Sequence, residues 1–237
     1  MMALMLRYVS PCRSRVLAEH SLQGVIFDMD GTLTVPALDF AKMKRLLGLQ
    51  PEQDILASVN SWPDEQRARA HEIIEQVELE GREKLALQPG LVELLEHLER
   101  ARVRAAIVTR NNRAAVEHFL AALPAERRGY FVPVLDRTFQ PVKPAPDAAL
   151  HICRAWDVAP EQVLFVGDSR DDLLCGRSAS TATCLLLCEQ PNNHKLKPLA
   201  DLHANSLTEL LSWLRAERPI EIVVREHQQH DEHERQR

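Results

Sequence analysis

The chain has 237 residues, of which 45% are hydrophobic and 27% are charged, and its formal net charge at pH 7 is −5. This length and apolar content suffice for one substantial core and a small accessory domain. The negative net charge argues against nucleic acid or an anionic membrane as the main partner. No apolar run approaches the roughly 18 residues that a membrane-spanning helix needs. We therefore expect neither nucleic acid nor a membrane as a partner.

The N-terminal residues 1–20 are predicted to be an extension. Residues 1–18 carry three arginines and two serines but no acid, which is typical of a transit peptide. The alternative is a frayed leader on a cytosolic protein. The five cysteines form no CxxC pair and no Cys/His zinc spacing, which favours buried thiols in a reducing compartment. We expect a cytoplasmic protein, or a mitochondrial or plastid one if the extension is a transit peptide.

A short apolar run at 25–27 has the length and β-branched content of a strand that is buried on both faces. It ends in Asp28 and Asp30, with Gly31 directly behind them, so that two carboxylates lie close together where the chain leaves the sheet. Such a pair repels itself unless a positive charge lies between. A hard divalent cation such as Mg²⁺ takes carboxylate and carbonyl oxygens. The stretch therefore predicts a metal site that also attracts phosphate.

The segment that follows, 37–87, is predicted to be helical and highly charged. One helix is expected from Asp39 to Gly48, a second over 52–59, and a longer one from Pro63 onward. The apolar stripe of the long helix is thin. This composition is typical of a small helical unit rather than of a second large core.

From residue 89 onward the pattern alternates between helix and strand, which indicates parallel βαβ units. Strands are expected at 103–108, 131–135, 163–166 and 183–187, and helices at 91–98, 115–123, 148–156 and 206–214. Pro133 favours an edge position for the second of these strands. Ser206 and Glu209 predict a capping box at the last helix. The fold class is α/β, with a Rossmann-like open parallel sheet, helices on both of its faces, and a small all-α unit inserted after the first strand.

Three further stretches place polar side chains at strand ends or in a stiff loop. Thr109 and Arg110 follow a strand and precede a helix N-terminus, where free backbone N–H groups favour an anion. Lys143 lies in a loop with three prolines, which restrict where its ammonium can go. The strand at 163–166 ends in Gly167-Asp168-Ser169, followed by two further acids. Taken singly, the threonine fits an ordinary helix cap and the lysine a solvated loop.

Together and in this order, DMDGTLT at 28–34, Thr109, KPAPD at 143–147 and GDSRDD at 167–172 resemble the four motifs of the haloacid dehalogenase-like hydrolases, a superfamily made up mostly of phosphatases. The resemblance implies that Asp28 is the catalytic nucleophile, which becomes a transient aspartyl-phosphate. It implies that Asp30 is the catalytic acid and base. The phosphate-binding residues would be Thr109, Arg110 and Lys143.

The resemblance also implies a metal site for Mg²⁺. Its ligands would be the Asp28 carboxylate, the Asp30 backbone carbonyl and Asp168. Asp172 would steady Lys143 or the metal's waters. Asp171 departs from the family pattern, in which many members have Asn, and would alter the charge near the metal. A second departure is Ser180, where the family often has a Gly that closes the helix in a left-handed conformation.

By the same resemblance, residues 21–36 and 88–215 form the core domain and residues 37–87 form a mobile cap over the active site. The alternative for 37–87 is a structural appendage. Residues 216–237 are mostly charged, His and Gln, with one apolar run at 220–224, and are expected to be largely disordered.

The leading hypothesis is a Mg²⁺-dependent phosphatase that acts on a small phosphorylated metabolite, as a monomer or homodimer. A dehalogenase is disfavoured, because that branch has no second Asp at the Asp30 position and needs no metal. A phosphomutase shares all four motifs, and a non-catalytic scaffold of the same fold is a further alternative. The sequence fits phosphoglycolate, sugar phosphates and nucleotides about equally.

Overall fold

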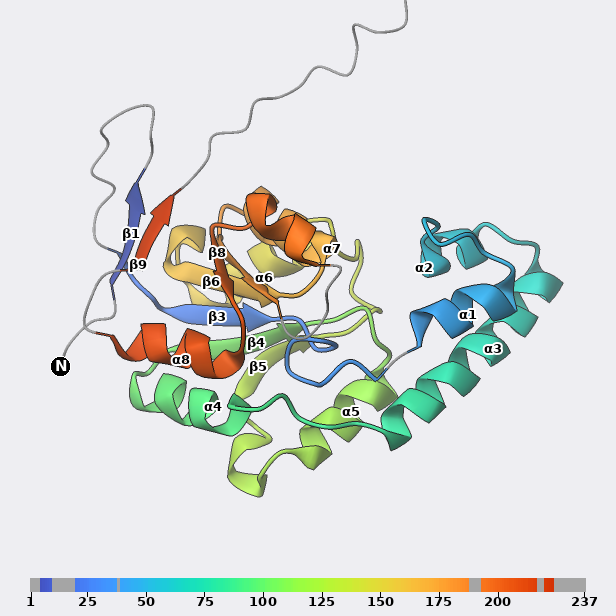
Figure 1. Ribbon diagram of the computed structural model, residues 1–237, viewed down its shortest axis with the longest axis horizontal. Coiled ribbons are helices and arrows are strands. Elements are labelled where there is room, and N and C mark those ends of the chain that lie inside the picture. The colour runs from blue at the N-terminus through green and yellow to red at the C-terminus, as the bar shows by residue number, and fades with distance from the viewer. Residues whose placement is uncertain (1–4, 10–19, 38, 188–192, 217–219, 224–237) are drawn as a thin grey trace, which may run out of the picture.

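The computed structural model describes residues 5–9, 20–37, 39–187, 193–216 and 220–223. Its centre is a six-stranded parallel sheet in the order β5-β4-β3-β6-β7-β8 (Figure 1). The strands are β3 (Gly24–Phe27), β4 (Arg104–Val108), β5 (Phe131–Leu135), β6 (Val163–Gly167), β7 (Ala182–Leu186) and β8 (Leu202–Ala204). The predicted Rossmann-like α/β fold is confirmed.

Helices cover both faces of this sheet (Figure 1). One face packs against α4 (Leu91–Arg100), α5 (Arg113–Ala122) and α8 (Leu207–Arg215), and the other against α6 (Asp147–Trp156) and α7 (Arg170–Ser178). Alternate residues of β3 point to opposite faces: Val25 and Phe27 belong to the first cluster, and Ile26 to the second. All three are fully buried. The run is apolar throughout because neither face of the central strand meets water.

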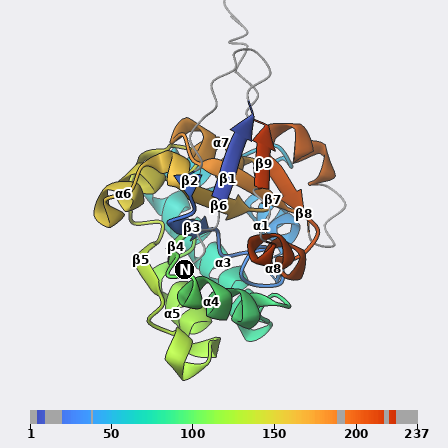
Figure 2. The ribbon, with the colours of Figure 1, turned by 90° about the vertical axis from the view of Figure 1, so that its left-hand side faces the viewer.

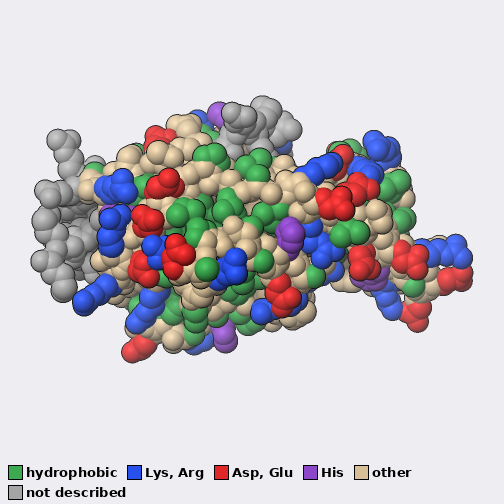
Figure 3. All heavy atoms as spheres, turned by 90° about the horizontal axis from the view of Figure 1, so that it is seen from below, with side chains coloured by type: hydrophobic (Ala, Val, Ile, Leu, Met, Phe, Trp, Pro, Cys, Tyr) green, Lys and Arg blue, Asp and Glu red, His purple; other side chains and the backbone are tan. Residues whose placement is uncertain are grey.

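The segment between β3 and α4 forms α1 (Phe40–Leu47), α2 (Ile55–Asn60) and α3 (Asp64–Glu83). We call these the insertion helices. They lie beyond the carboxyl ends of the strands (Figure 1). Their buried apolar side chains form a cluster of their own, made of Met43, Leu47, Ile55, Val59, Ala70, Ile74 and Val77. Acidic and basic side chains are interspersed over this end of the molecule (Figure 3).

The ends of the insertion helices follow from local capping. Asp39 accepts a hydrogen bond from the Lys42 N–H, and Gly48 ends α1 in the left-handed conformation, so the first helix lies as predicted. The second starts three residues later than predicted, because Asp54 caps it by accepting from the Ala57 N–H over 2.8 Å.

The rest of the core agrees with the predicted elements, with two additions and one correction. β5 is an edge strand, as Pro133 indicated. The three-residue β8 and the 3₁₀ turns were not predicted; the turns lie at Ala125–Arg127, Pro160–Gln162 and His194–Leu199. Ser206 caps α8, but the Glu209 carboxylate accepts from the Asn205 N–H instead of from Ser206, so the predicted capping box is only half formed.

A second, three-stranded sheet joins the two ends of the chain. β1 (Met5–Val9) pairs in parallel with β9 (Ile220–Val223) and antiparallel with β2 (His20–Ser21). Figure 2, seen from the end opposite the insertion helices, shows β1 and β9 side by side. β9 lies in the apolar run of the predicted tail, and β1 lies in the predicted N-terminal extension, so each of these segments contributes a strand. The rest of 1–18 and of 216–237 lies mostly outside the described residues.

Three cysteines of the described part, Cys153, Cys175 and Cys184, are buried free thiols, as predicted, and burial raises the pKa of each. Cys12 and Cys188 lie outside the described residues. Among the described helices, none is both long enough and apolar enough to cross a bilayer.

Candidate active site

The predicted site residues meet at one edge of the sheet, because the carboxyl ends of parallel strands point the same way. Asp28 follows β3, Thr109 follows β4 and Asp168 follows β6, and these three strands are direct neighbours. From β3 the chain goes to β4 and then β5 on one side, and it then crosses to β6 on the other side of β3. Such a reversal opens a crevice at the strand ends, where α/β proteins bind ligands.

Lys143 lies between two buried carboxylates. Its Nζ donates to Asp28 Oδ1 over 2.5 Å and to Asp172 Oδ1 over 2.6 Å, and its side chain is only 3% exposed. Burial alone would lower the pKa of Lys143, but Asp172 and Asp28 outweigh that effect and raise it. The ammonium is therefore held in its charged form.

Asp172 is fixed by the start of α7. Its Oδ2 accepts from the Ser169 N–H over 3.0 Å and from the Ser169 hydroxyl over 2.6 Å, while Ser169 caps the helix. Since its Oδ1 already accepts from Lys143, both carboxylate oxygens are engaged. Asp172 thus orients the lysine, which agrees with the supporting role predicted for it.

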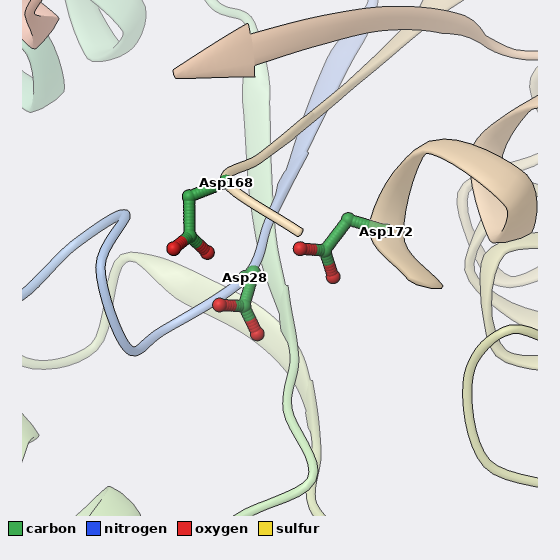
Figure 4. A group of neighbouring side chains, drawn as sticks. All are labelled: Asp28, Asp168 and Asp172. Carbon is green, nitrogen blue, oxygen red and sulfur yellow. The ribbon is translucent and has the colours of Figure 1, made fainter. Parts of the chain in front are cut away.

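Asp168 completes an acidic cluster with Asp28 and Asp172. Figure 4 shows the three carboxylates facing one another, and one oxygen from each lies within 4.8 Å of the others. Burial, followed by the neighbouring carboxylates, raises the pKa of both Asp28 and Asp168. Hard oxygen donors with unbalanced negative charge fit a small divalent cation. Because Asp172 is committed to Lys143 and Ser169, Asp28 and Asp168 are the carboxylates that can ligate it.

Asp30 is held by polar side chains that surround it. Asn111 Nδ2 donates to its Oδ2, and the Thr34 hydroxyl lies 3.5 Å from its Oδ1. Burial raises the pKa of Asp30, and the hydrogen bond from Asn111 partly offsets this rise. A carboxyl whose pKa is raised can carry a proton to a leaving group.

Thr109 is 4% exposed and lies at the end of β4. Its backbone N–H donates to the Leu135 carbonyl over 2.9 Å, and its hydroxyl oxygen accepts from the Asn111 N–H over 3.1 Å. Asn112 then caps α5 through the Ala115 N–H. The hydroxyl and the helix start therefore lie where the sequence predicts an anion.

Arg110, which the sequence predicts to bind phosphate, is paired with carboxylates instead. Its guanidinium donates to Asp171 over 2.8 Å and to Asp54 of the second insertion helix over 2.6 Å. The guanidinium thus links the core to the insertion, with carboxylates on both sides. Asp171, expected to alter the charge near the metal, is paired with this arginine instead.

A cavity of about 320 Å³ lies between the strand ends and the insertion helices. Its core side is lined by Asp28, Asp30, Thr109, Lys143 and Asp168. Its other side is lined by Phe40, Met43, Ile55, Ile74 and Glu78. The predicted site residues therefore open onto a partly enclosed space that can hold the rest of a small molecule.

Sequence reasoning assigned no role to Glu78 and Arg137, which line this cavity. Glu78 accepts from Arg137 over 2.7 Å and from Asn112 over 2.6 Å. The position of Glu78, four residues after the buried Ile74, could have marked it as an acid on the apolar face of its helix. Arg137 lies two residues past the end of β5, and that strand end is a second signal.

The profile of the haloacid dehalogenase-like hydrolases matches residues 34–186. A haloacid dehalogenase-like hydrolase domain-containing protein of Arabidopsis thaliana is 41% identical over 181 residues, which cover 71% of this chain and 72% of the plant protein. Phosphoglycolate phosphatase 1 of Pseudomonas aeruginosa is 30% identical over 231 residues, which cover 84% of this chain and 82% of that enzyme.

Solved structures share the fold. A hydrolase from Pseudomonas syringae superposes with a TM-score of 0.68 at 21% identity, covering 80% of this chain and 96% of that one. Identity at this level speaks for the architecture alone. The range matched by the family profile, 34–186, includes the insertion helices.

Proposed function

We propose that this chain, which belongs to the phosphatase branch of the haloacid dehalogenase-like hydrolases, hydrolyses a small phosphorylated metabolite with the help of Mg²⁺. The observation that carries the proposal is the buried group of Asp28, Lys143, Asp172 and Asp168 at the floor of a partly enclosed cavity. Phosphoryl transfer to an aspartate requires a nucleophilic carboxylate, a fixed ammonium and a site for a divalent cation.

Asp28 acts as the nucleophile. Its carboxylate oxygen forms a bond to phosphorus while the bond from phosphorus to the alcohol oxygen breaks, giving an aspartyl-phosphate on Asp28 and a free alcohol. The hydrogen bond from Lys143 orients the attacking carboxylate. Water then attacks the aspartyl-phosphate, releases inorganic phosphate and regenerates Asp28.

Asp30 moves the protons of both steps. In the first it gives its proton to the departing alcohol oxygen, and in the second it takes a proton from the attacking water. Asn111 and Thr34 hold its carboxyl in place for both. General acid and base help of this kind contributes roughly 10²- to 10⁴-fold.

The transferring phosphoryl oxygens are stabilised by Lys143 and by Thr109 with the adjacent helix start. A bound Mg²⁺, held by Asp28, Asp168 and the Asp30 backbone carbonyl, would supply positive charge to the same oxygens. We assign Arg110 to the contact between core and insertion instead of to phosphate, because Asp54 and Asp171 already hold its guanidinium.

The insertion helices serve as the cap of this site. They close the cavity on the side away from the strands, and their attachment to the core includes two sets of polar contacts, at Arg110 and at Glu78. The ion pairs of Arg110, whose side chain is 28% exposed, are partly in water and break at small energetic cost. Such contacts suit a cap that opens to admit substrate and release alcohol.

The experiment is hydrolysis of p-nitrophenyl phosphate by the full chain, followed as release of nitrophenol and of inorganic phosphate. We expect turnover with Mg²⁺, none in excess EDTA, and recovery when Mg²⁺ is restored. Full activity in EDTA would contradict the metal assignment. Transfer of the phosphoryl group to an added sugar phosphate without release of inorganic phosphate would favour a mutase.

A further inference from the structure

Negative charge exceeds positive charge among the described residues that line the cavity. Its six carboxylates belong to Asp28, Asp30, Asp54, Glu78, Asp168 and Asp171. Its four cations belong to Lys44, Arg110, Arg137 and Lys143. One divalent cation would balance the difference. The dianionic phosphoryl group would then enter a site without surplus positive charge, so that a second anionic group on the substrate has little to attract it.

Three of these four cations are already paired with carboxylates. Lys143 and Arg110 each lie between two of them. Arg137 Nη1 donates to Glu78 Oε1 over 2.7 Å. The fourth cation, Lys44, donates to a backbone carbonyl in the loop between α1 and α2. A substrate carboxylate would have to displace one of these partners to gain a cation.

Two consecutive asparagines hold the proton-transferring carboxyl of Asp30 and the carboxylate of Glu78, one each. Asn111 donates to Asp30, and Asn112 Nδ2 donates to Glu78 Oε2 over 2.6 Å. Asn112 is itself oriented, because its Oδ1 caps α5. Asp30 must face the leaving oxygen to protonate it. Glu78, which is 7% exposed and lines the same cavity, therefore borders the space of the leaving alcohol.

We propose that Glu78 is a specificity-determining residue that selects a neutral, hydroxyl-bearing leaving group, of the polyol or sugar class. A carboxylate accepts about four hydrogen bonds, and two of these positions on Glu78 are filled by Arg137 and Asn112. Hydroxyl groups of the substrate can donate to the others. A leaving group with its own carboxylate or second phosphate would meet Glu78 as a like charge.

The apolar side of the cavity fits the same class of leaving group. Phe40, which is 52% exposed, lies on this side together with Ile74 and Met43. The carbon-bound hydrogens of a polyol or sugar can pack against such a wall while its hydroxyls face Glu78. The inference rests on the proposed phosphatase function and adds the chemistry of its substrate.

The test compares two esters of nearly equal shape. Phosphoglycolate carries a carboxylate where 2-hydroxyethyl phosphate carries a hydroxymethyl group. We expect the wild-type chain with Mg²⁺ to favour the neutral ester in kcat/KM by at least about tenfold. Glu78→Gln leaves Arg137 without its carboxylate and should shift this ratio toward phosphoglycolate by at least about tenfold.

A matched control is Glu80→Gln, on the same helix. Glu80 pairs with Lys42 and does not line the cavity, so its loss removes a carboxylate and an ion pair without altering the leaving-group space. The ratio of the two esters should stay at its wild-type value in this variant. A ratio is insensitive to a general loss of folded protein, so a merely structural role of Glu78 would leave it unchanged.

Measuring the binding of each ester tests this inference separately from the proposed function. The Asp28→Asn variant is titrated with each ester in a calorimeter in the presence of Mg²⁺. If the wild-type chain fails to hydrolyse p-nitrophenyl phosphate, the phosphatase assignment is contradicted. If the variant still binds the neutral ester more tightly than phosphoglycolate, the selection by Glu78 is supported all the same. Equal or tighter binding of phosphoglycolate, or an unchanged ratio in Glu78→Gln, would overturn the inference.

Discussion

The two sides of the cavity each place a cation between two carboxylates, but in different surroundings. Lys143, on the core side, is 3% exposed and lies between Asp28 and Asp172. Arg110, a core residue at the contact with the insertion, is 28% exposed and lies between Asp54 of the insertion and Asp171 of the core. Burial makes the first arrangement costly to disturb, whereas water screens the second. Under the proposed function, the side assigned to the chemistry is therefore the rigid one, and the side assigned to the leaving group can adjust.

The largest effect on turnover should come from substituting Asp28 and Asp30, the two acids of the rigid side, one at a time. Asp28→Asn removes the nucleophile and should lower kcat at least about 10³-fold on every ester. Asp30→Asn should cost about 10²- to 10⁴-fold on an alkyl phosphate, whose leaving oxygen needs a proton. An aryl phosphate has a better leaving group, so the Asp30 variant should lose far less on it.

The measurement is steady-state kinetics on both esters together with acid-quench trapping of the phosphoenzyme. Trapped phosphate is expected in the Asp30 variant and not in the Asp28 variant. Asp64→Asn is the control, because this carboxylate is 93% exposed on the insertion. Equal losses on both esters, or phosphate trapped on a histidine, would contradict the roles assigned to the two acids.

The next largest contrast should come from replacing each of the two cations, Lys143 and Arg110, in turn. Lys143→Met leaves Asp28 and Asp172 facing each other without a counter-charge, and removing one partner from a buried ionic group costs about 3–5 kcal/mol. Arg110→Met leaves carboxylates that remain in contact with water, so it should cost at most about 1 kcal/mol. Urea unfolding in EDTA measures both free energies. Similar losses in the two variants would remove the distinction between the two sides.

The same distinction governs how much could be predicted from the sequence. The rigid side could be predicted from the sequence. Apolar runs that end in polar residues predict the strands, and they also predict the edge of the sheet where Asp28, Thr109 and Asp168 meet. The other side could not, since the partners of Arg110 come from residues 56 and 61 positions away. Such contacts depend on how the helices pack, which no local pattern specifies.

Pairing between the chain ends escaped prediction for the same reason. Met5–Val9 and Ile220–Val223 are each short, and neither has a turn that would join it to the other. The positive φ of Ser180, by contrast, follows from its place at the end of α7, and the structure agrees with that prediction (φ 64°).

Comparing Gly31 with Gly48 tests how tightly the side chains of the rigid side are packed. Gly31 and Gly48 both have positive φ, 79° and 69°, so Gly→Ala should cost roughly 1–2 kcal/mol at either. A β-carbon at Gly31 would also overlap the Asp168 carboxylate, whereas nothing lies within 4 Å of one at Gly48. Only Gly31→Ala should then lower activity, by at least about tenfold at limiting Mg²⁺. Magnesium titrations of turnover check this, and equal activity losses would contradict it.

The smallest effect should appear in the core but away from the site. Ser180 is exposed and has a left-handed backbone (φ 64°), which costs a residue with a β-carbon roughly 1–2 kcal/mol. Ser180→Gly removes that strain, but glycine also loses more entropy on folding, by about 0.4–1 kcal/mol. The net gain in the free energy of unfolding should therefore be below about 1 kcal/mol, a rise in Tm of roughly 1–3 °C, with kcat unchanged. Ser180→Ala keeps the strain and loses only the hydroxyl, so it should not stabilise the protein. If thermal unfolding shows the same gain for both variants, the hydroxyl and not the backbone is the source of the strain.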